Sequence, residues 1–352
     1  MKKPLPREQA LLLQRINEKR TERARIKQKS PSHPRKKKFI SRDECKNWPQ
    51  LPLPENFCLS NYDQAVDAIS KVKNSIGKEI YIDFDTIREV DTATAIMLAA
   101  ELEVMKIKSK KSRMVAHDSH WFPEVRTLLV QMGFLQLLSA IPEIPLDAEP
   151  PKNHIFVKFQ SGHKLIGDNI VQILEKLQKN IPIKKFSADL LVHLCVGISE
   201  AITNTYQHAY HGHHRNQHNK LNRWWISASI NKQTHEIRVV CYDRGATIPK
   251  TIESSLFPVF SEGKIIFNTI KERKSSTKDK NRGKGLSELL RLIDKNKQGT
   301  LRIYSGKGLV EFKRSKNGEN TDISEELPRK MEGTLVEWSI IPDRSTIATE
   351  TH

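Results

Sequence analysis

The alternation of hydrophobic and polar positions predicts a first group of strands and helices in the N-terminal half of the chain. Residues 78–84 place apolar side chains at every second position, which is the period of a half-buried strand. The stretch DTATAIMLAAELEVMKIK predicts a helix with Asp91 or Thr92 at its N-cap. Strands and helices that alternate in this way predict a small α/β unit. The elements are a strand at 78–84, a helix at 91–108, a strand at 112–118 and a helix at 123–133 that ends in glycine.

A second group of elements opens with a long helix that carries polar residues at a regular spacing. Residues 186–198 bear leucine and isoleucine at helical spacing, which predicts a face turned toward a core. The stretch SEAITNTYQHAY then places Glu200, Asn204 and His208 four residues apart, so their side chains project from nearly the same face. Taken alone, such a row is either a solvated helix edge or one wall of a site.

Two proline-bearing stretches divide the chain. Residues 47–57 and 140–153 interrupt the periodic pattern, and proline disfavours the interior of helices and sheets. The predicted organisation is a basic arm with its linker at 1–50, a first α/β unit at 51–143, a proline-rich linker at 144–153, a second unit at 154–342 and a tail at 343–352.

Positive charge is concentrated at the N-terminus. The chain of 352 residues has a formal net charge of +18, and its first 40 residues hold 14 Lys or Arg against three Glu. Such a basic segment is either a solvated tail or an arm that holds nucleic acid or an acidic partner. The four cysteines are scattered, which favours free thiols in the cytoplasm over a disulfide framework. We expect no signal peptide and no membrane span, because the longest apolar run, at 95–100, is far too short.

The first unit carries three stretches in a fixed order, namely the strand at 78–84, EVDTATAIML and VRTLLVQMGFLQLL. In that order they resemble the STAS domain, the fold of anti-sigma factor antagonists. In that family an aspartate followed by serines opens the helix, and a serine there is the phosphorylation target. Here Thr92 offers a hydroxyl after Asp91, whereas Ala93 interrupts the serine pair. The resemblance implies Thr92 as a candidate phosphoacceptor, and capping of the helix by Asp91 and Thr92 is the alternative explanation.

Three short motifs follow the Glu200 helix in the second unit. RVVCYDRGATIP runs an apolar strand into Asp243, NRGKGLSELLRLI puts two glycines before an amphipathic helix, and EGTLVEWSIIP is a Gly-Thr step into a strand. This order resembles the GHKL superfamily, which includes type II topoisomerases, heat-shock chaperone ATPases, histidine kinases and anti-sigma factor serine kinases. The resemblance implies a GHKL (Bergerat) α/β sandwich that binds ATP. The residues that match the family pattern are Glu200, Asn204, Asp243, Gly245, Gly283, Gly285, Leu286, Gly333 and Thr334.

The resemblance also implies a role for each residue type. Asn204 would bind Mg²⁺ through its carbonyl oxygen, and Glu200, one turn away, would orient or deprotonate the nucleophile. Asp243 would accept a hydrogen bond from the exocyclic amine of adenine, which favours ATP over GTP. The other nucleotide-binding candidates are Gly245 near the base, Gly283, Lys284, Gly285 and Leu286 at the phosphates before a helix N-terminus, and Thr334 in the last motif.

The second unit departs from the family pattern in three respects. Thr247 stands where a second glycine is usual, and residues 254–280, the expected lid, contain only Gly263. No helical hairpin with a phosphoacceptor histidine precedes the unit, which argues against a conventional sensor histidine kinase. The histidines between 211 and 218 are predicted to form a polar loop, because no cysteine or carboxylate lies nearby to complete a metal site.

A STAS-like unit joined to a GHKL-like unit implies a bacterial cytoplasmic regulator of the partner-switching type. We expect it to bind Mg²⁺–ATP and either to hydrolyse it or to transfer phosphate to a Ser/Thr hydroxyl, with the first unit as control or docking surface. Two alternatives stay open: a non-catalytic, nucleotide-gated interaction module that uses its basic arm, and an ATP-driven DNA clamp. The expected partner is a protein, while nucleic acid at the basic arm and a homodimer also stay open.

Overall fold

The computed structural model describes most of both predicted units. The described residues are 40–41, 43–109, 113–138, 140, 142–145, 153–163, 167–180, 188–210, 220–252, 260–272 and 285–342. Residues 1–39 of the predicted arm and linker at 1–50, the predicted histidine loop between 211 and 218, and the tail at 343–352 lie outside them. The described fold is mixed α/β, as the alternating pattern predicts, with both parallel and antiparallel sheets. No helix among these residues is long and apolar enough to cross a membrane.

The first unit combines small parallel sheets with helices. A three-stranded sheet has the order β1-β3-β5, and β2 pairs with β4. The predicted strand at 78–84 and the helices at 91–108 and 123–133 are confirmed to within one residue at each end. The elements are β1 (Gln50–Pro52), β2 (Asn56–Phe57), α2 (Tyr62–Lys73), β3 (Glu79–Asp83), β4 (Glu89–Val90), α3 (Thr92–Lys108), β5 (Arg113–Val115), α4 (Pro123–Met132) and α5 (Phe134–Leu137).

Local chemistry explains where these helices begin and end. The Asp91 side chain accepts hydrogen bonds from the Thr94 backbone amide at 2.7 Å and from the Leu59 amide at 2.8 Å. It is therefore the N-cap of α3, one of the two predicted candidates. Helix α4 begins with proline and ends at Gly133, whose φ of 100° lies in the left-handed region that glycine adopts without strain.

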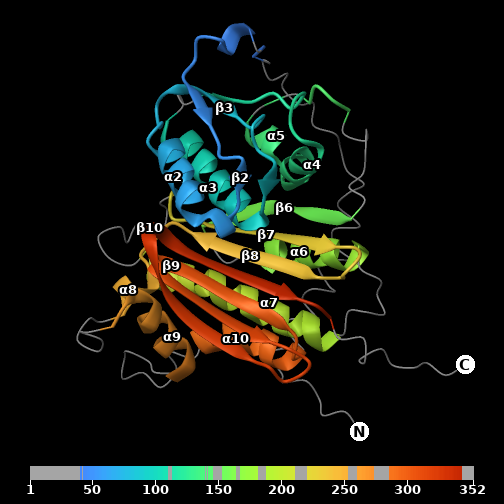
Figure 1. Ribbon diagram of the computed structural model, residues 1–352, viewed down its shortest axis with the longest axis vertical. Helices are drawn as coiled ribbons and strands as arrows, with labels where there is room; N and C mark the ends of the chain where they lie inside the picture. Colours follow the sequence, from blue (N-terminus) through green and yellow to red (C-terminus); the bar gives the residue numbers. More distant parts are fainter. Residues whose placement is uncertain are drawn as a thin grey trace, which may run out of the picture.

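The second unit is built on one antiparallel sheet. Its strand order is β6-β7-β8-β10-β9, so that β8 pairs with β7 on one side and β10 on the other. Helices α7 and α10 pack against each other on one face of this sheet (Figure 1). The strands are β6 (His154–Gly162), β7 (Trp224–Asn231), β8 (Ile237–Asp243), β9 (Gly299–Arg314) and β10 (Thr321–Ile340). The helices are α6 (Gly167–Asn180), α7 (Ala188–Asn204), which a π-helical turn continues at Thr205–Ala209, α8 (Ile248–Thr251), α9 (Glu262–Glu272) and α10 (Gly285–Asn296).

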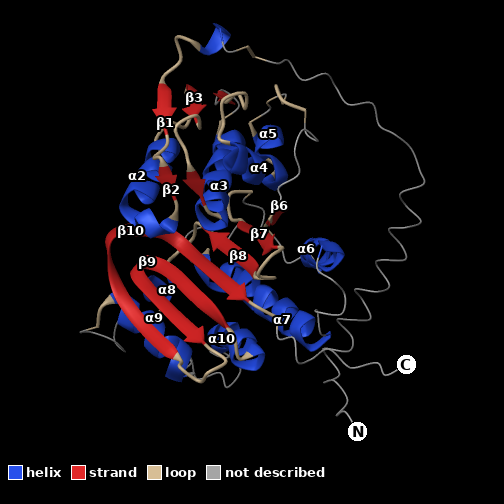
Figure 2. Cartoon of the chain, turned by 45° about the vertical axis from the view of Figure 1, so that its right-hand side comes forward, coloured by secondary structure: helices blue, strands red, loops and turns tan. Residues whose placement is uncertain are grey.

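The first unit covers the opposite face of the five-stranded sheet. Helix α3 packs against β7 and β8, and α4 packs against β6. Figure 1 shows these helices above the sheet and α7, α9 and α10 below it, and Figure 2 shows the arrangement from a second direction. One hydrophobic cluster accordingly joins α3 to Trp225, Tyr242 and Leu335 of the sheet. Of the 17 residues of α3, 13 are buried, which explains why its sequence is apolar around the whole circumference.

Candidate functional site

A pocket of about 60 Å³, here called the α7–α10 pocket, lies where α7, the end of β8, α8, α10 and β10 meet. Its walls are largely apolar and include Ile202, Ile248 and Val336. These walls come from elements that are far apart in the sequence, so folding brings together motifs that the chain carries separately. The predicted site residues that line the pocket are Asn204, Asp243, Leu286 and Thr334.

Asp243 ends β8 and is almost completely buried, with 5% of its surface exposed. Its carboxylate accepts hydrogen bonds from the Gly245 amide at 2.8 Å and the Thr205 hydroxyl at 3.2 Å. The backbone amide of Thr334, on the neighbouring strand, also donates to it. Burial raises the pKa of Asp243 to about 7, and these three donors oppose the rise. The carboxylate is thus fixed in place and retains acceptor capacity toward the pocket.

The loop after Asp243 packs tightly against the end of α7. The Ala246 amide donates to the Ala209 carbonyl at 2.6 Å, and a Cβ at Gly245 would stand 2.4 Å from that same carbonyl oxygen. This close approach of two backbone segments accounts for the glycine by itself. The sequence motif predicts that Gly245 lets a nucleotide base approach the backbone. The close packing against Ala209 is a second explanation for glycine at this position.

Helix α7 and the π-helical turn that continues it bring two of the three regularly spaced polar residues to the pocket. Asn204 and His208 line it, and the regular helix ends at Asn204, where the π-helical turn begins. Among the described residues, the Asn204 amide nitrogen is buried without a hydrogen-bond partner, and so is the Thr247 hydroxyl in the adjoining loop. Buried polar atoms are normally satisfied, so the Asn204 amide, which lines the pocket, keeps a donor that a ligand bound there could use.

Glu200, one turn before Asn204, is half-buried and lies outside the pocket lining. Burial raises its pKa, and the negative charge of Glu288 on α10 raises it further. The asparagine carbonyl is an oxygen donor, which suits a hard cation such as Mg²⁺. No cluster of three or more His, Cys, Asp or Glu side chains that could hold a metal occurs in the described part of the chain.

The predicted phosphate-binding segment is described only in part. Gly285 begins α10 and Leu286 lines the pocket, so this helix starts beside the same pocket as Asp243. Gly283 and Lys284 lie outside the described residues. The geometry of the glycine motif itself therefore stays a prediction.

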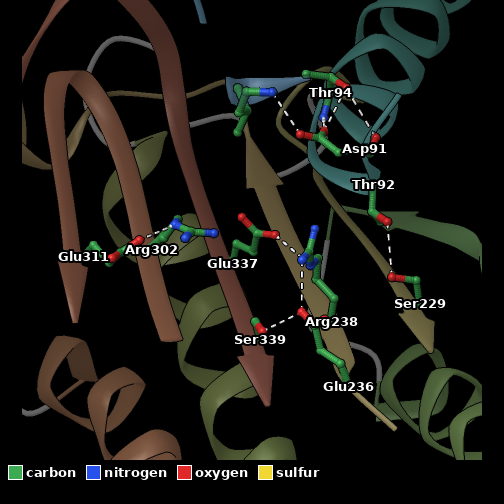
Figure 3. A network of polar contacts seen from close by, with 11 residues as sticks. Asp91, Thr92, Thr94, Ser229, Glu236, Arg238, Arg302, Glu311, Glu337 and Ser339 are labelled. Carbon is green, nitrogen blue, oxygen red and sulfur yellow. Dashed lines mark hydrogen bonds and ion pairs between the residues drawn. The ribbon is translucent and has the colours of Figure 1, made fainter. Parts of the chain in front are cut away.

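Thr92 lies on the other face of the sheet, away from the α7–α10 pocket. Its side chain is 3% exposed, and its hydroxyl donates to the Ser229 hydroxyl on β7 at 3.3 Å (Figure 3). It also lines a second cavity, of about 450 Å³, together with Arg88 and Arg238. The candidate phosphoacceptor is thus buried in the contact between the units, beside that cavity.

Two side chains that bond to predicted site residues were not themselves predicted. Thr205 binds Asp243 and follows Asn204 directly, so its position next to a motif residue was a usable signal. Ser305 on β9 bonds to the Thr334 hydroxyl at 2.8 Å. No motif surrounds Ser305, and only the register of β9 with β10 brings it to the site.

The sequence was compared with models of protein families and with curated proteins, and nothing in either comparison matched it. The features of this chain that bear on function are therefore the α7–α10 pocket, the motif residues that converge there, the fixed carboxylate of Asp243 and the Asn204 amide nitrogen.

Proposed function

We propose that the protein binds Mg²⁺–ATP in the α7–α10 pocket and hydrolyses it or transfers its terminal phosphoryl group to a Ser/Thr hydroxyl. The observation that carries the proposal is the convergence of Asn204, Asp243 and Thr334 on one pocket, with Asp243 held by fixed donors. The order of the motifs, which resembles the GHKL superfamily, supports it. The second unit would then be a GHKL-type α/β sandwich, and the STAS-like first unit the control or docking surface of a cytoplasmic regulator.

Asp243 is the residue that we propose recognises the nucleotide base. A buried carboxylate accepts from a donor and repels another acceptor, so it favours the exocyclic amine of adenine over the carbonyl that guanine carries at that position. The pocket volume of about 60 Å³ is smaller than the volumes of pockets that enclose whole ligands. The base would therefore fill the pocket, and the phosphates would extend along the start of α10, where free backbone amides favour anions.

Glu200 is the proposed general base. Its raised pKa brings its basicity closer to neutral pH, which favours acceptance of a proton from water or from a protein hydroxyl during the reaction. The Asn204 carbonyl would hold Mg²⁺, a hard cation that also binds the nucleotide phosphates. The backbone amides at the start of α10 would stabilise the charge that develops on the leaving phosphate.

Glu200→Gln is expected to lower the release or transfer of phosphate by about 100-fold while ATP affinity stays within a few-fold of the parent. The amide keeps the size of the side chain and loses the capacity to take a proton. The measurement is incubation of the purified chain with Mg²⁺ and γ-labelled ATP, in which label on the protein and free phosphate are followed separately. Asp189→Asn, an exposed change on the same helix, is the control and should react like the parent.

The products decide between the candidate activities. Label on the chain that is lost in Glu200→Gln would identify a kinase, and its position would test Thr92. Free phosphate alone, lost in the variant, would identify an ATPase. ATP binding with neither product in either protein would leave a nucleotide-gated interaction module. Absence of ATP binding by the parent chain would overturn the proposal.

A further inference from the structure

Helix α3 of the first unit directs two carboxylates into the second unit. Glu101 is 2% exposed, and its Oε1 atom lies 2.5 Å from Nε of the Arg244 guanidinium. Glu103 accepts hydrogen bonds from the Trp225 indole nitrogen at 2.6 Å and from the Arg223 guanidinium at 3.2 Å. Both carboxylates of this helix segment are therefore bonded to side chains that belong to the other unit.

Arg244 belongs to the loop that forms one wall of the α7–α10 pocket. It follows Asp243 directly, and Ala246, two residues later, lines the pocket and bonds to Ala209 at the end of α7. Because Gly245 and Ala209 are already in close contact, the loop has little room to move independently of α7. A shift of the Arg244 backbone is therefore expected to shift the wall of the pocket that carries Asp243 and Ala246.

A second route joins α3 to the same loop. Glu103 binds Arg223, whose carbonyl accepts from the Tyr210 hydroxyl at 2.8 Å. That hydroxyl in turn accepts from the Arg244 backbone amide at 3.2 Å. Tyr210 directly follows the π-helical turn that supplies Thr205 to the pocket. Both routes begin on α3 and end at Arg244.

We propose that α3 positions the loop at 244–246 through the Glu101–Arg244 ion pair, so that docking of the first unit and binding of nucleotide in the α7–α10 pocket are energetically coupled. Glu101 is then a positioning residue that acts through Arg244. The nucleotide part of this inference rests on the proposed function, whereas the positioning of the loop does not. Coupling is reciprocal, so ATP binding strengthens the contact between α3 and the sheet by the same factor by which that contact strengthens ATP binding.

The buried pair suits this role because neither partner is stable when left alone. Removing one partner of a buried ion pair leaves an uncompensated charge, which is strongly destabilising. When α3 withdraws, the Arg244 guanidinium has to move toward solvent or toward the exposed Glu332 carboxylate, which is 4.0 Å away. Either movement displaces the loop, so a change in docking becomes a change in pocket shape.

Another buried ion pair on the same side of the sheet offers a matched comparison. Glu337 is 5% exposed and pairs with Arg238 at 3.2 Å (Figure 3). Arg238 stands five residues before Asp243 along β8, roughly 16 Å from Asp243 at the rise of an extended strand. Glu337→Gln therefore makes the same chemical change in a buried ion pair that does not touch the loop, and Arg238 keeps Glu236 as a second partner at 2.9 Å.

The test compares Glu101→Gln with Glu337→Gln in the full chain. Hydrogen exchange of the Gly245 and Ala246 amides in the nucleotide-free protein reports on the loop, and titration with a non-hydrolysable ATP analogue reports on the pocket. We expect Glu101→Gln to speed exchange at both amides and to weaken analogue binding about tenfold, with Glu337→Gln leaving both unchanged. Glu101→Asp keeps the charge and shortens the side chain, so it should show a smaller change of the same kind even where the glutamine variant fails to fold.

The readouts separate the two proposals. Unchanged exchange at both amides in the Glu101 variants, or an equal change in Glu337→Gln, would overturn the positioning role. Faster exchange with unaltered analogue affinity would overturn the coupling to nucleotide. Faster exchange in a protein whose parent chain binds no analogue would support the positioning role and overturn only the proposed function.

Discussion

Replacement of Asp243 by asparagine is expected to weaken ATP binding by about 100-fold. The carboxylate is the proposed acceptor for the exocyclic amine of adenine, and a hydrogen bond to a charged group contributes about 1.5–3 kcal/mol. An asparagine has one acceptor oxygen, which it turns either toward the Gly245 amide or toward the base, so one donor loses its partner in either case. Titration with a non-hydrolysable ATP analogue at about pH 8, where the carboxyl group is largely ionised, measures the loss.

The same substitution is expected to remove a pH-dependent loss of stability. Burial raises the pKa of Asp243 from 3.8 to about 7 in the folded protein, so between these values the folded state binds a proton that the unfolded state has released. The stability that this group contributes is therefore present below about pH 4 and is lost as the pH rises to about 7, a total of about 4 kcal/mol at about 1.4 kcal/mol per pH unit. The free energy of unfolding of Asp243→Asn should lack this decline.

Chemical denaturation at about pH 5 and about pH 8 checks the linkage. Asp294→Asn, which changes an exposed carboxylate on α10, should keep the pH dependence of the parent. An ATP affinity and a pH dependence of stability in Asp243→Asn equal to those of the parent would contradict the assignment of the base to Asp243. If Asp243→Asn is more stable than the parent at about pH 8 and binds ATP less well, then Asp243 serves ligand binding and lowers the free energy of unfolding.

Local patterns in this sequence predict helices and strands better than they predict which of these elements pack together. The cap at Asp91 and the helix end at Gly133 follow from chemistry within a few residues, and both are found. The helix at 92–108 is also predicted, and its apolar circumference indicates burial on every side. The surface that covers its second side belongs to strands more than a hundred residues later, such as Trp225 on β7, and no local period encodes that contact.

The candidate site shows the same limit. The order of the motifs leads to Asn204 and Asp243, and the fold brings them to one pocket. The Glu101–Arg244 pair joins residues 143 positions apart, with no shared motif or spacing to connect them. Thr92 is a candidate from a resemblance in the sequence, whereas its burial depends on β7, which lies outside the first unit. Motifs therefore lead to residues that line one pocket, and the contacts that hold those residues in place emerge only from the tertiary fold.

Gly333→Ala is expected to lower the free energy of unfolding by at least about 4 kcal/mol, a large effect for a single methyl group. Gly333 has a φ of 73°, a conformation that costs a residue with a side chain about 1–2 kcal/mol. In addition, its added Cβ would stand 1.8 Å from the Asp243 carbonyl oxygen and 2.7 Å from the Arg244 Cα. The two backbone segments would have to part, which opens the pairing of β10 with β8 at the edge of the pocket.

Gly318→Ala is the matched control, because Gly318 has a φ of 84° and no atom of the described chain within 4 Å of its added Cβ. It should cost only about 1–2 kcal/mol from the backbone conformation, so the difference between the two variants measures the contact with Asp243. Urea denaturation gives both values. Equal losses of unfolding free energy in the two variants would mean that the Cβ added at position 333 does not clash with the Asp243 carbonyl. A stable Gly333→Ala that loses only ATP affinity would assign the glycine to the ligand, so the two measurements separate what the fold requires from what the site requires.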